Sequence, residues 1–222
     1  MESRGLLPYR DVIGNVAGIL TVAQFLSGCF ACNQIRLKGT SEGCSPLQFV
    51  LGAALTALQL KYSQLLGVKT LILTSAYSMA ICVVYSAWYL VYTPARKRGA
   101  FWRLVFETVA VVGAILLYAG MESPEKVKYR FGMLVTVLTL AYIGLPLMRL
   151  GEIVKRKSCE GLPLPVILAS TGASVLWLLY GIILHNYFII TQKVIALGLC
   201  IAQLSMFVIY PAPKIGTVNK TK

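Results

Sequence analysis

Apolar runs of about 20 residues alternate with short polar segments along most of the chain. To within a few residues, these runs cover 12–32, 46–66, 70–92, 104–121, 131–150, 162–184 and 187–210. A helix of about 20 apolar residues spans the roughly 30 Å hydrocarbon core of a bilayer. The pattern therefore predicts an all-α integral membrane protein with seven transmembrane helices. The linkers are too short to fold as a separate catalytic domain, so we do not expect an enzyme.

Composition agrees with this pattern. Hydrophobic residues make up 57% of the 222 positions and charged residues only 13%, and the mean hydropathy is +0.73. A soluble domain of this size cannot bury so much apolar surface in one core, so the lipid bilayer is an expected partner. The first apolar run lacks the charged start and small-residue cleavage site of a signal peptide, so we expect it to be the first membrane helix.

The net charge of +13 does not indicate nucleic-acid binding, because the basic residues divide unequally between the two sides of the membrane. One side has six: Arg4, Arg10, Lys69, Lys126, Lys128 and Arg130. The other has thirteen: Arg36, Lys38, Arg96, Lys97, Arg98, Arg103, Arg149, Lys155, Arg156, Lys157, Lys214, Lys220 and Lys222. The side richer in Lys and Arg is generally cytoplasmic. This predicts an N-terminus outside or in a lumen and a C-terminus in the cytoplasm.

An internal repeat is visible at a spacing of 118 residues. The segment IRLKGTSEG, which ends at Gly43, has a counterpart IVKRKSCEG ending at Gly161, and 161 − 43 = 118. Likewise LQLKY ends at Tyr62 and LWLLY ends at Tyr180, again 118 apart. Spans 1–3 and 5–7 are therefore two copies of one three-helix unit.

Span 4 adds one crossing, so the second copy runs in the same direction as the first. We expect a first repeat at 10–94, a linker helix and loops at 95–130, and a second repeat at 131–213. Two parallel repeats related by an axis along the membrane normal enclose a solute site near the middle of the bilayer in known transporters.

These features resemble the SWEET (saliva-type) sugar transporter family, and especially its animal and insect branch. The resemblance rests on the 3+1+3 layout and on IVKRKSCEGLPLP, LWLLYG, FVIYP and, in span 1, QFLSG. It implies facilitated, bidirectional transport of a mono- or disaccharide by alternating access, without a cofactor. It also implies a plasma-membrane location, with the Golgi or another endomembrane as the alternative, and leaves a homo-oligomer open.

The resemblance also implies a substrate pocket. Its aromatic position in span 6 falls on Trp177, and the matching position in span 2 falls on Gln59. The two positions where the family carries asparagine, in spans 3 and 7, fall on Ser75 and Lys193. Aromatic rings stack on the C–H faces of sugars, and amides both donate to and accept from sugar hydroxyls.

The resemblance further implies that the two units rock against each other during alternating access, about hinges in spans 1, 2, 5 and 6. They fall on Gly28, Gln48, Pro146 and Pro163, with Pro165 as an alternative to the last. Proline within a spanning helix frees a backbone carbonyl and permits a bend, and glycine can bend as well.

Lys193 is the residue whose place most needs an explanation. Its side chain could extend to the membrane surface, or it could be a donor or a cation in the solute pathway. A retinal Schiff base is disfavoured, because span 3 has no carboxylate to serve as counter-ion. Trp177 could instead serve only helix packing, and Ser75 and Gln59 only hydrogen bonding between helices.

Other functions stay open at this point. The chain could carry another small polar or anionic solute, or could be a membrane scaffold that transports nothing. No metal site is expected, because Cys29 and Cys32 form a single C-x-x-C without a second pair.

Overall fold

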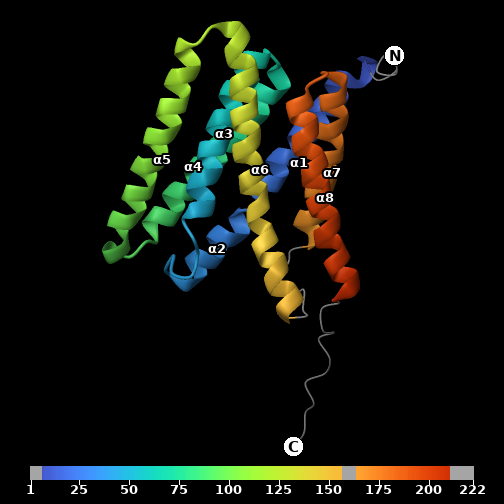
Figure 1. Cartoon of the computed structure of the whole chain (residues 1–222). Coiled ribbons are helices and arrows are strands. Elements are labelled where there is room, and N and C mark those ends of the chain that lie inside the picture. Colours follow the sequence, from blue (N-terminus) through green and yellow to red (C-terminus); the bar gives the residue numbers. More distant parts are fainter. Residues whose placement is uncertain (1–6, 157–163, 211–222) are drawn as a thin grey trace, which may run out of the picture.

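Long helices that run between two opposite faces build the whole molecule (Figure 1). The computed structural model describes residues 7–156 and 164–210, with the backbone alone for residues 7, 124 and 145–156. After a short 3-10 turn at Leu7–Tyr9 come α1 (Arg10–Leu26), α2 (Cys29–Lys38), α3 (Leu47–Leu66), α4 (Lys69–Val91), α5 (Ala95–Met121), α6 (Pro124–Arg156), α7 (Leu164–Ile183) and α8 (Tyr187–Ile209). We call the face at which α1 begins the N face, and the opposite one the C face.

The predicted seven-helix membrane architecture is confirmed. Six segments of the described chain are long and apolar enough to cross a bilayer: α1 with α2, α4, α5, the Glu125–Gly144 part of α6, α7 and α8. The seventh, α3, has 20 residues and lies between α4 and α6. It is the more polar one because it carries Gln48, Gln59 and Lys61, two of which line the central cavity described below.

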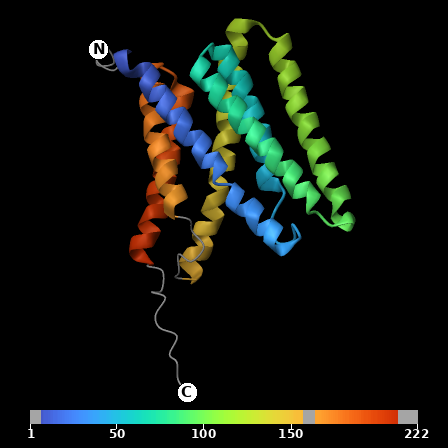
Figure 2. The same ribbon diagram turned by 180° about the vertical axis from the view of Figure 1, so that it is seen from behind.

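The helices form a closed ring. Neighbouring helices contact one another in the order α1, α4, α3, α6, α8, α7 and back to α1, and the views from the front and from behind agree (Figures 1 and 2). In each three-helix unit, the third helix lies between the first and the second. The two units meet at two places, where α1 contacts α7 and where α3 contacts α6.

Several helices extend beyond the predicted apolar runs. α5 begins at Ala95 where the sequence predicts 104, and α6 covers Pro124–Arg156 where it predicts 131–150. The first span continues past residue 32 to Lys38, with an interruption between α1 and α2. Hydropathy marks only the part of a helix that faces hydrocarbon. Charged residues continue the same backbone hydrogen bonding beyond it, so the helix ends were predicted too short.

The linker helix α5 lies at the edge of the molecule, against α3 (Figure 1). Its outer side exposes large apolar side chains, among them Phe106 at 67% and Leu117 at 70%. A spanning helix meets lipid with such side chains, because its backbone groups are already paired within the helix. α5 is therefore outside the ring that encloses the cavity.

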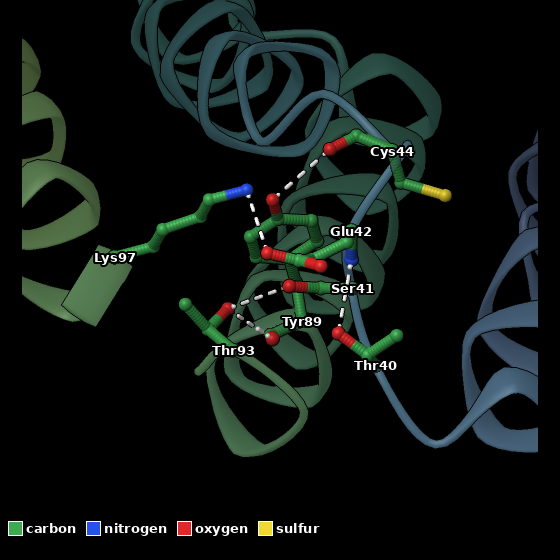
Figure 3. Close-up of polar contacts among 7 residues, drawn as sticks. All are labelled: Thr40, Ser41, Glu42, Cys44, Tyr89, Thr93 and Lys97. Carbon is green, nitrogen blue, oxygen red and sulfur yellow. Dashed lines mark hydrogen bonds and ion pairs between the residues drawn. The ribbon is translucent and has the colours of Figure 1, made fainter. Parts of the chain in front are cut away.

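On the C face, the loop between α2 and α3 is fastened to the turn between α4 and α5 (Figure 3). The backbone N–H of Ser41 donates to the carbonyl of Tyr92 at 3.0 Å, and the hydroxyls of Ser41 and Thr93 share a hydrogen bond of 3.1 Å. Lys97 pairs with Glu42 at 2.8 Å. These contacts hold the first repeat together where its helices leave the membrane.

Candidate functional site

A cavity of about 420 Å³ lies inside the helix ring, a size typical of sites for small organic molecules. Its lining comes from both three-helix units. The first unit contributes residues of α1, α3 and α4, and the second contributes Thr139, Tyr142, Val166, Trp177, Ile189, Gln192 and Lys193. The polar lining groups other than Lys193 are uncharged, most of them hydroxyls and amides, and they stand among apolar side chains such as Phe49 and Leu55, a combination typical of sites for small organic molecules with polar groups.

The lining residues follow the 118-residue repeat. Each of the second unit's lining residues in the described chain comes 118 positions after a lining residue of the first unit. The pairs are Thr21 and Thr139, Gln24 and Tyr142, Gln48 and Val166, Gln59 and Trp177, Leu71 and Ile189, Thr74 and Gln192, and Ser75 and Lys193. The cavity therefore lies on the axis that relates the two repeats.

The four residues singled out for the pocket from the sequence come together here. Trp177, Gln59, Ser75 and Lys193 all line the cavity. Trp177 is only 5% exposed and also belongs to the core between α1 and α7. For this residue the packing interpretation and the pocket interpretation therefore both describe the structure.

Two of the four predicted hinge positions, Gly28 and Gln48, line the same cavity. Pro146 is in α6, which continues through it as a helix, in a stretch whose backbone alone is described. Pro163 lies outside the described residues. The hinge role of all four stays a prediction.

The helix break at Gly28 has a specific hydrogen-bonding environment. α1 ends at Leu26 and α2 begins at Cys29. Near the break, the carbonyls of Phe25 and Leu26 accept hydrogen bonds from the hydroxyl of Tyr85, at 3.2 and 3.1 Å. A Cβ added at Gly28 would lie 2.6 Å from Cε2 of Tyr85. Glycine is thus required here for the close approach of the ring that satisfies these carbonyls.

Matching hydrogen bonds cross the two places where the repeats meet. Between α7 and α1, Nε1 of Trp177 donates to Oγ1 of Thr21 at 2.7 Å. Between α3 and α6, Nε2 of Gln59 donates to Oγ1 of Thr139 at 3.2 Å. The two donors are repeat equivalents of each other, and so are the two acceptors. In each unit, the pocket residue therefore donates to a threonine on the first helix of the other unit.

Nearer the N face, a glycine of one unit packs against a tyrosine of the other at each of the two places where the units meet. A Cβ built on Gly14 would lie 2.6 Å from Cε2 of Tyr180, and one built on Gly132 would lie 2.9 Å from Cε2 of Tyr62. These pairs are again 118 residues apart. Because glycine has no side chain, the tyrosine rings pack directly on the backbone of α1 and α6, and the cavity lies on the C-face side of them.

Sequence reasoning missed Gln192, which is beside Lys193 and only 4% exposed. Its Nε2 donates to Thr136 at 2.8 Å, and its Oε1 accepts from Nε2 of Gln59 at 3.5 Å. These bonds connect α8 to α6 and to α3 across the cavity wall. The repeat spacing pairs it with Thr74, which also lines the cavity, but neither residue has a signal of its own in the sequence.

Lys193 itself is half-buried and is the single charged residue among the described residues that line the cavity. Within the described part of the chain, no carboxylate forms an ion pair with it. Lys193 therefore lies in the wall of the cavity, as the pocket interpretation predicts, and its contact with a solute stays a prediction.

A polar cavity on the axis between two parallel three-helix units, with one further helix outside, is the architecture of a membrane transporter. The model of a family described as "Sugar efflux transporter for intercellular exchange" matches residues 11–97 and 129–215. The two matches are separated by 129 − 11 = 118 residues, the repeat spacing found in the sequence. The chain belongs to this family, the SWEET family, and is a transporter rather than an enzyme.

Relatives and a solved structure agree with this assignment. The "Sugar transporter SWEET1" of Drosophila pseudoobscura pseudoobscura is 28% identical over 204 residues, which are 90% of this chain and 89% of the relative. That of Homo sapiens is 26% identical over 198 residues, 87% and 86% of the two chains. A solved eukaryotic SWEET transporter superimposes with a TM-score of 0.85 at 19% identity, over 90% of this chain and 96% of that one, and shows the same fold.

Proposed function

We propose that this protein carries a sugar across a membrane by facilitated diffusion in both directions. The observation that carries the proposal is the polar cavity on the repeat axis, whose lining residues correspond pairwise between the two units. A site on such an axis can be exposed first to one side and then to the other when the units rock against each other. The names of the relatives supply the solute class.

In this proposal the moving units are residues 10–94 and 131–213, with Trp177, Gln59, Ser75 and Lys193 in contact with the solute. The Gly14–Tyr180 and Gly132–Tyr62 contacts support a state that is closed towards the N face. Gly28 is the preferred bending point of the first unit, because the helix is already interrupted there. Pro146 is its repeat equivalent in the second.

We further infer that the N face is outside the cell and the C face cytoplasmic, with the plasma membrane as the location. The unequal division of Lys and Arg supports this orientation. The glycosylation sequence at Asn219 is then cytoplasmic and stays unmodified, and a glycan found on Asn219 would overturn the orientation. A homo-oligomer stays open, and crosslinking in native membranes tests it.

Uptake by the purified full chain in liposomes tests the transport proposal. Radiolabelled glucose, sucrose and trehalose are each supplied outside, and at least one should equilibrate across the membrane faster than in empty liposomes. Preloading with the same unlabelled sugar should accelerate entry of the label, because a carrier that works in both directions exchanges solute. No flux of any sugar by folded protein would refute the proposal.

Trp177→Ala is the informative variant, and Trp102→Ala is its matched control. Trp177 lines the cavity, whereas Trp102 is on α5 and is 46% exposed. We expect Trp177→Ala to lose most of the flux and Trp102→Ala to keep it, at equal amounts of folded protein in the liposomes. Equal loss in both variants would assign the effect to folding and not to the pocket.

A further inference from the structure

One basic residue lines the cavity, and no carboxylate of the described chain pairs with it. Lys193 lines the cavity from α8, and the ion pairs of the described residues lie elsewhere, at Lys97–Glu42, Arg103–Glu107 and Arg130–Glu122. An isolated ammonium group inside a membrane protein is costly. In such a place it faces a water-filled cavity or an ion that passes through.

The polar groups beside Lys193 in the lining are uncharged and have partners of their own. The neighbour Gln192 uses its amide to bond Thr136 and Gln59. Ser75, the repeat equivalent of Lys193, shares a hydrogen bond of 3.3 Å with Ser63. These groups are neutral, so the three N–H donors of the lysine are left for whatever occupies the cavity.

A second polar group without a hydrogen-bond partner in the described chain lines the same cavity. The hydroxyl of Ser78 in α4 is buried without a hydrogen-bond partner among the described residues, and Ser78 is only 2% exposed. A buried polar group without a partner generally marks a place where a ligand or water supplies one. The cavity wall thus offers a cation and a hydroxyl that the protein leaves unsatisfied.

Because no acidic residue of the described chain pairs with the Lys193 ammonium group, a solute with one negative charge complements the cavity better than a neutral one. A carboxylate accepts several hydrogen bonds and forms charge-assisted contacts with an ammonium group, which are about twice as strong as neutral ones. The remaining lining combines hydroxyls, amides and Trp177 with apolar side chains such as Phe49 and Leu55, and such a mixture suits a sugar ring with its hydroxyls and C–H faces.

We propose that the preferred solute of this transporter is an anionic monosaccharide, a sugar acid, whose carboxylate is bound by Lys193. The inference rests on the proposed sugar transport and narrows it to one chemical class. It makes Lys193 a specificity-determining residue at the place where Ser75 stands in the first repeat.

The test compares glucose with glucuronate in the same proteoliposomes. The two solutes share the ring and its hydroxyls and differ by a carboxylate in place of the terminal CH2OH. We expect wild-type protein to carry glucuronate with the higher kcat/KM. Lys193→Met should lower the glucuronate-to-glucose ratio by about tenfold or more, because hydrogen bonds to charged groups contribute about 1.5–3 kcal/mol.

Two further variants separate charge from packing. Lys193→Arg keeps the charge and should keep a ratio in favour of glucuronate. Lys61→Met removes a lysine from α3 that is not among the residues lining the cavity, and should leave the ratio at the wild-type value. A change of the ratio in Lys61→Met equal to that in Lys193→Met would overturn the role of Lys193.

The outcomes distinguish this inference from the proposal on which it rests. If wild type carries glucose and discriminates against glucuronate, and if Lys193→Met leaves that ratio unchanged, then the sugar-acid inference is wrong and sugar transport stands. If wild type carries neither solute, nor any sugar of the uptake panel, then the transport proposal itself fails. Preference for glucuronate that depends on the charge at residue 193 supports both.

Discussion

The two repeats have equivalent helices but unequal chemistry. Ser75 in α4 and Lys193 in α8 occupy equivalent places beside the cavity, as do Gln59 in α3 and Trp177 in α7. The framework contacts, by contrast, are repeated almost unchanged, with Thr21 and Thr139 as acceptors in both units. A helix scaffold can therefore keep its symmetry at the contacts while the lining of the pocket between them becomes asymmetric.

This comparison separates residues that hold the repeats together from residues that meet the solute in the proposed function. Gly14, Gly132 and the two threonines belong to the first group, and Ser75 and Lys193 to the second. Substitutions in the first group should change stability in both repeats alike. Substitutions in the second should change solute preference in one repeat only.

The largest expected effect is on the glycine–tyrosine contacts. Gly14→Ala places a Cβ 2.6 Å from the ring of Tyr180, and Gly132→Ala places one 2.9 Å from the ring of Tyr62. Overpacking of this kind costs about 1–3 kcal/mol. Both variants should lower the free energy of unfolding in an SDS titration, Gly14→Ala at least as much as Gly132→Ala.

The control for this pair is Gly113→Ala in α5, where a Cβ has nothing within 4 Å. It should be neutral or stabilising by up to about 1 kcal/mol, because alanine favours a helix over glycine. If Gly14→Ala and Gly132→Ala changed the free energy of unfolding no more than Gly113→Ala does, then the glycine–tyrosine contacts would not be as closely packed as the structure indicates.

The next effect concerns the hydrogen bonds between the repeats. Double-mutant cycles with Trp177→Phe and Thr21→Val, and with Gln59→Leu and Thr139→Val, isolate each bond. We expect coupling energies of about 0.5–1.5 kcal/mol. The Trp177–Thr21 bond should have the larger value, because its 2.7 Å is shorter than 3.2 Å and the Gln59 amide is shared with Gln192. Zero coupling energy in both cycles would mean that these two hydrogen bonds do not help to hold the repeats together.

The smallest expected effect on stability concerns the loop between α2 and α3 on the C face. The equivalent loop of the second repeat includes residues 157–163, which lie outside the described residues. The hydrogen bond from Lys97, and then its charge, hold the pKa of Glu42 below its usual value. Because the pKa of Glu42 is lower in the folded than in the unfolded protein, its ionised carboxylate stabilises the fold at a pH above its pKa in the unfolded chain, about 4.3. This contribution is lost as the pH falls through the pKa of Glu42 in the folded protein. Glu42→Gln should therefore be slightly less stable than wild type at neutral pH, and equal to it in acid.

Thermal unfolding of both proteins between neutral pH and about pH 3 measures this difference. A gap that does not close in acid would mean that the charge of Glu42 is not its cause. High salt should also narrow the gap at neutral pH, since the pair is exposed and screened. Glu160→Gln, the repeat equivalent, extends the comparison to the second unit.

The apolar run lengths and the 118-residue spacing were enough to predict the seven spans and the two parallel repeats, whereas the four residues that line the cavity were predicted from the resemblance to the SWEET family. The spans and the repeats are local or periodic features, so they can be read from the chain itself. The helix ends were less predictable, because a helix continues through charged residues after the apolar run stops. The side-chain partners of Trp177 and Gln59 lie about 156 and 80 positions away, and nothing local indicates them.

The sequence by itself determined that a lysine stands in the last membrane span and that its repeat equivalent is a serine. Only the tertiary structure decided that Lys193 faces a cavity and that Gln192 beside it is bonded across the ring. In a membrane protein, the lipid-facing and the protein-facing sides of a helix are both apolar. Which side turns inward is therefore decided by the packing of small residues such as Gly14 and Gly132 against the opposite repeat.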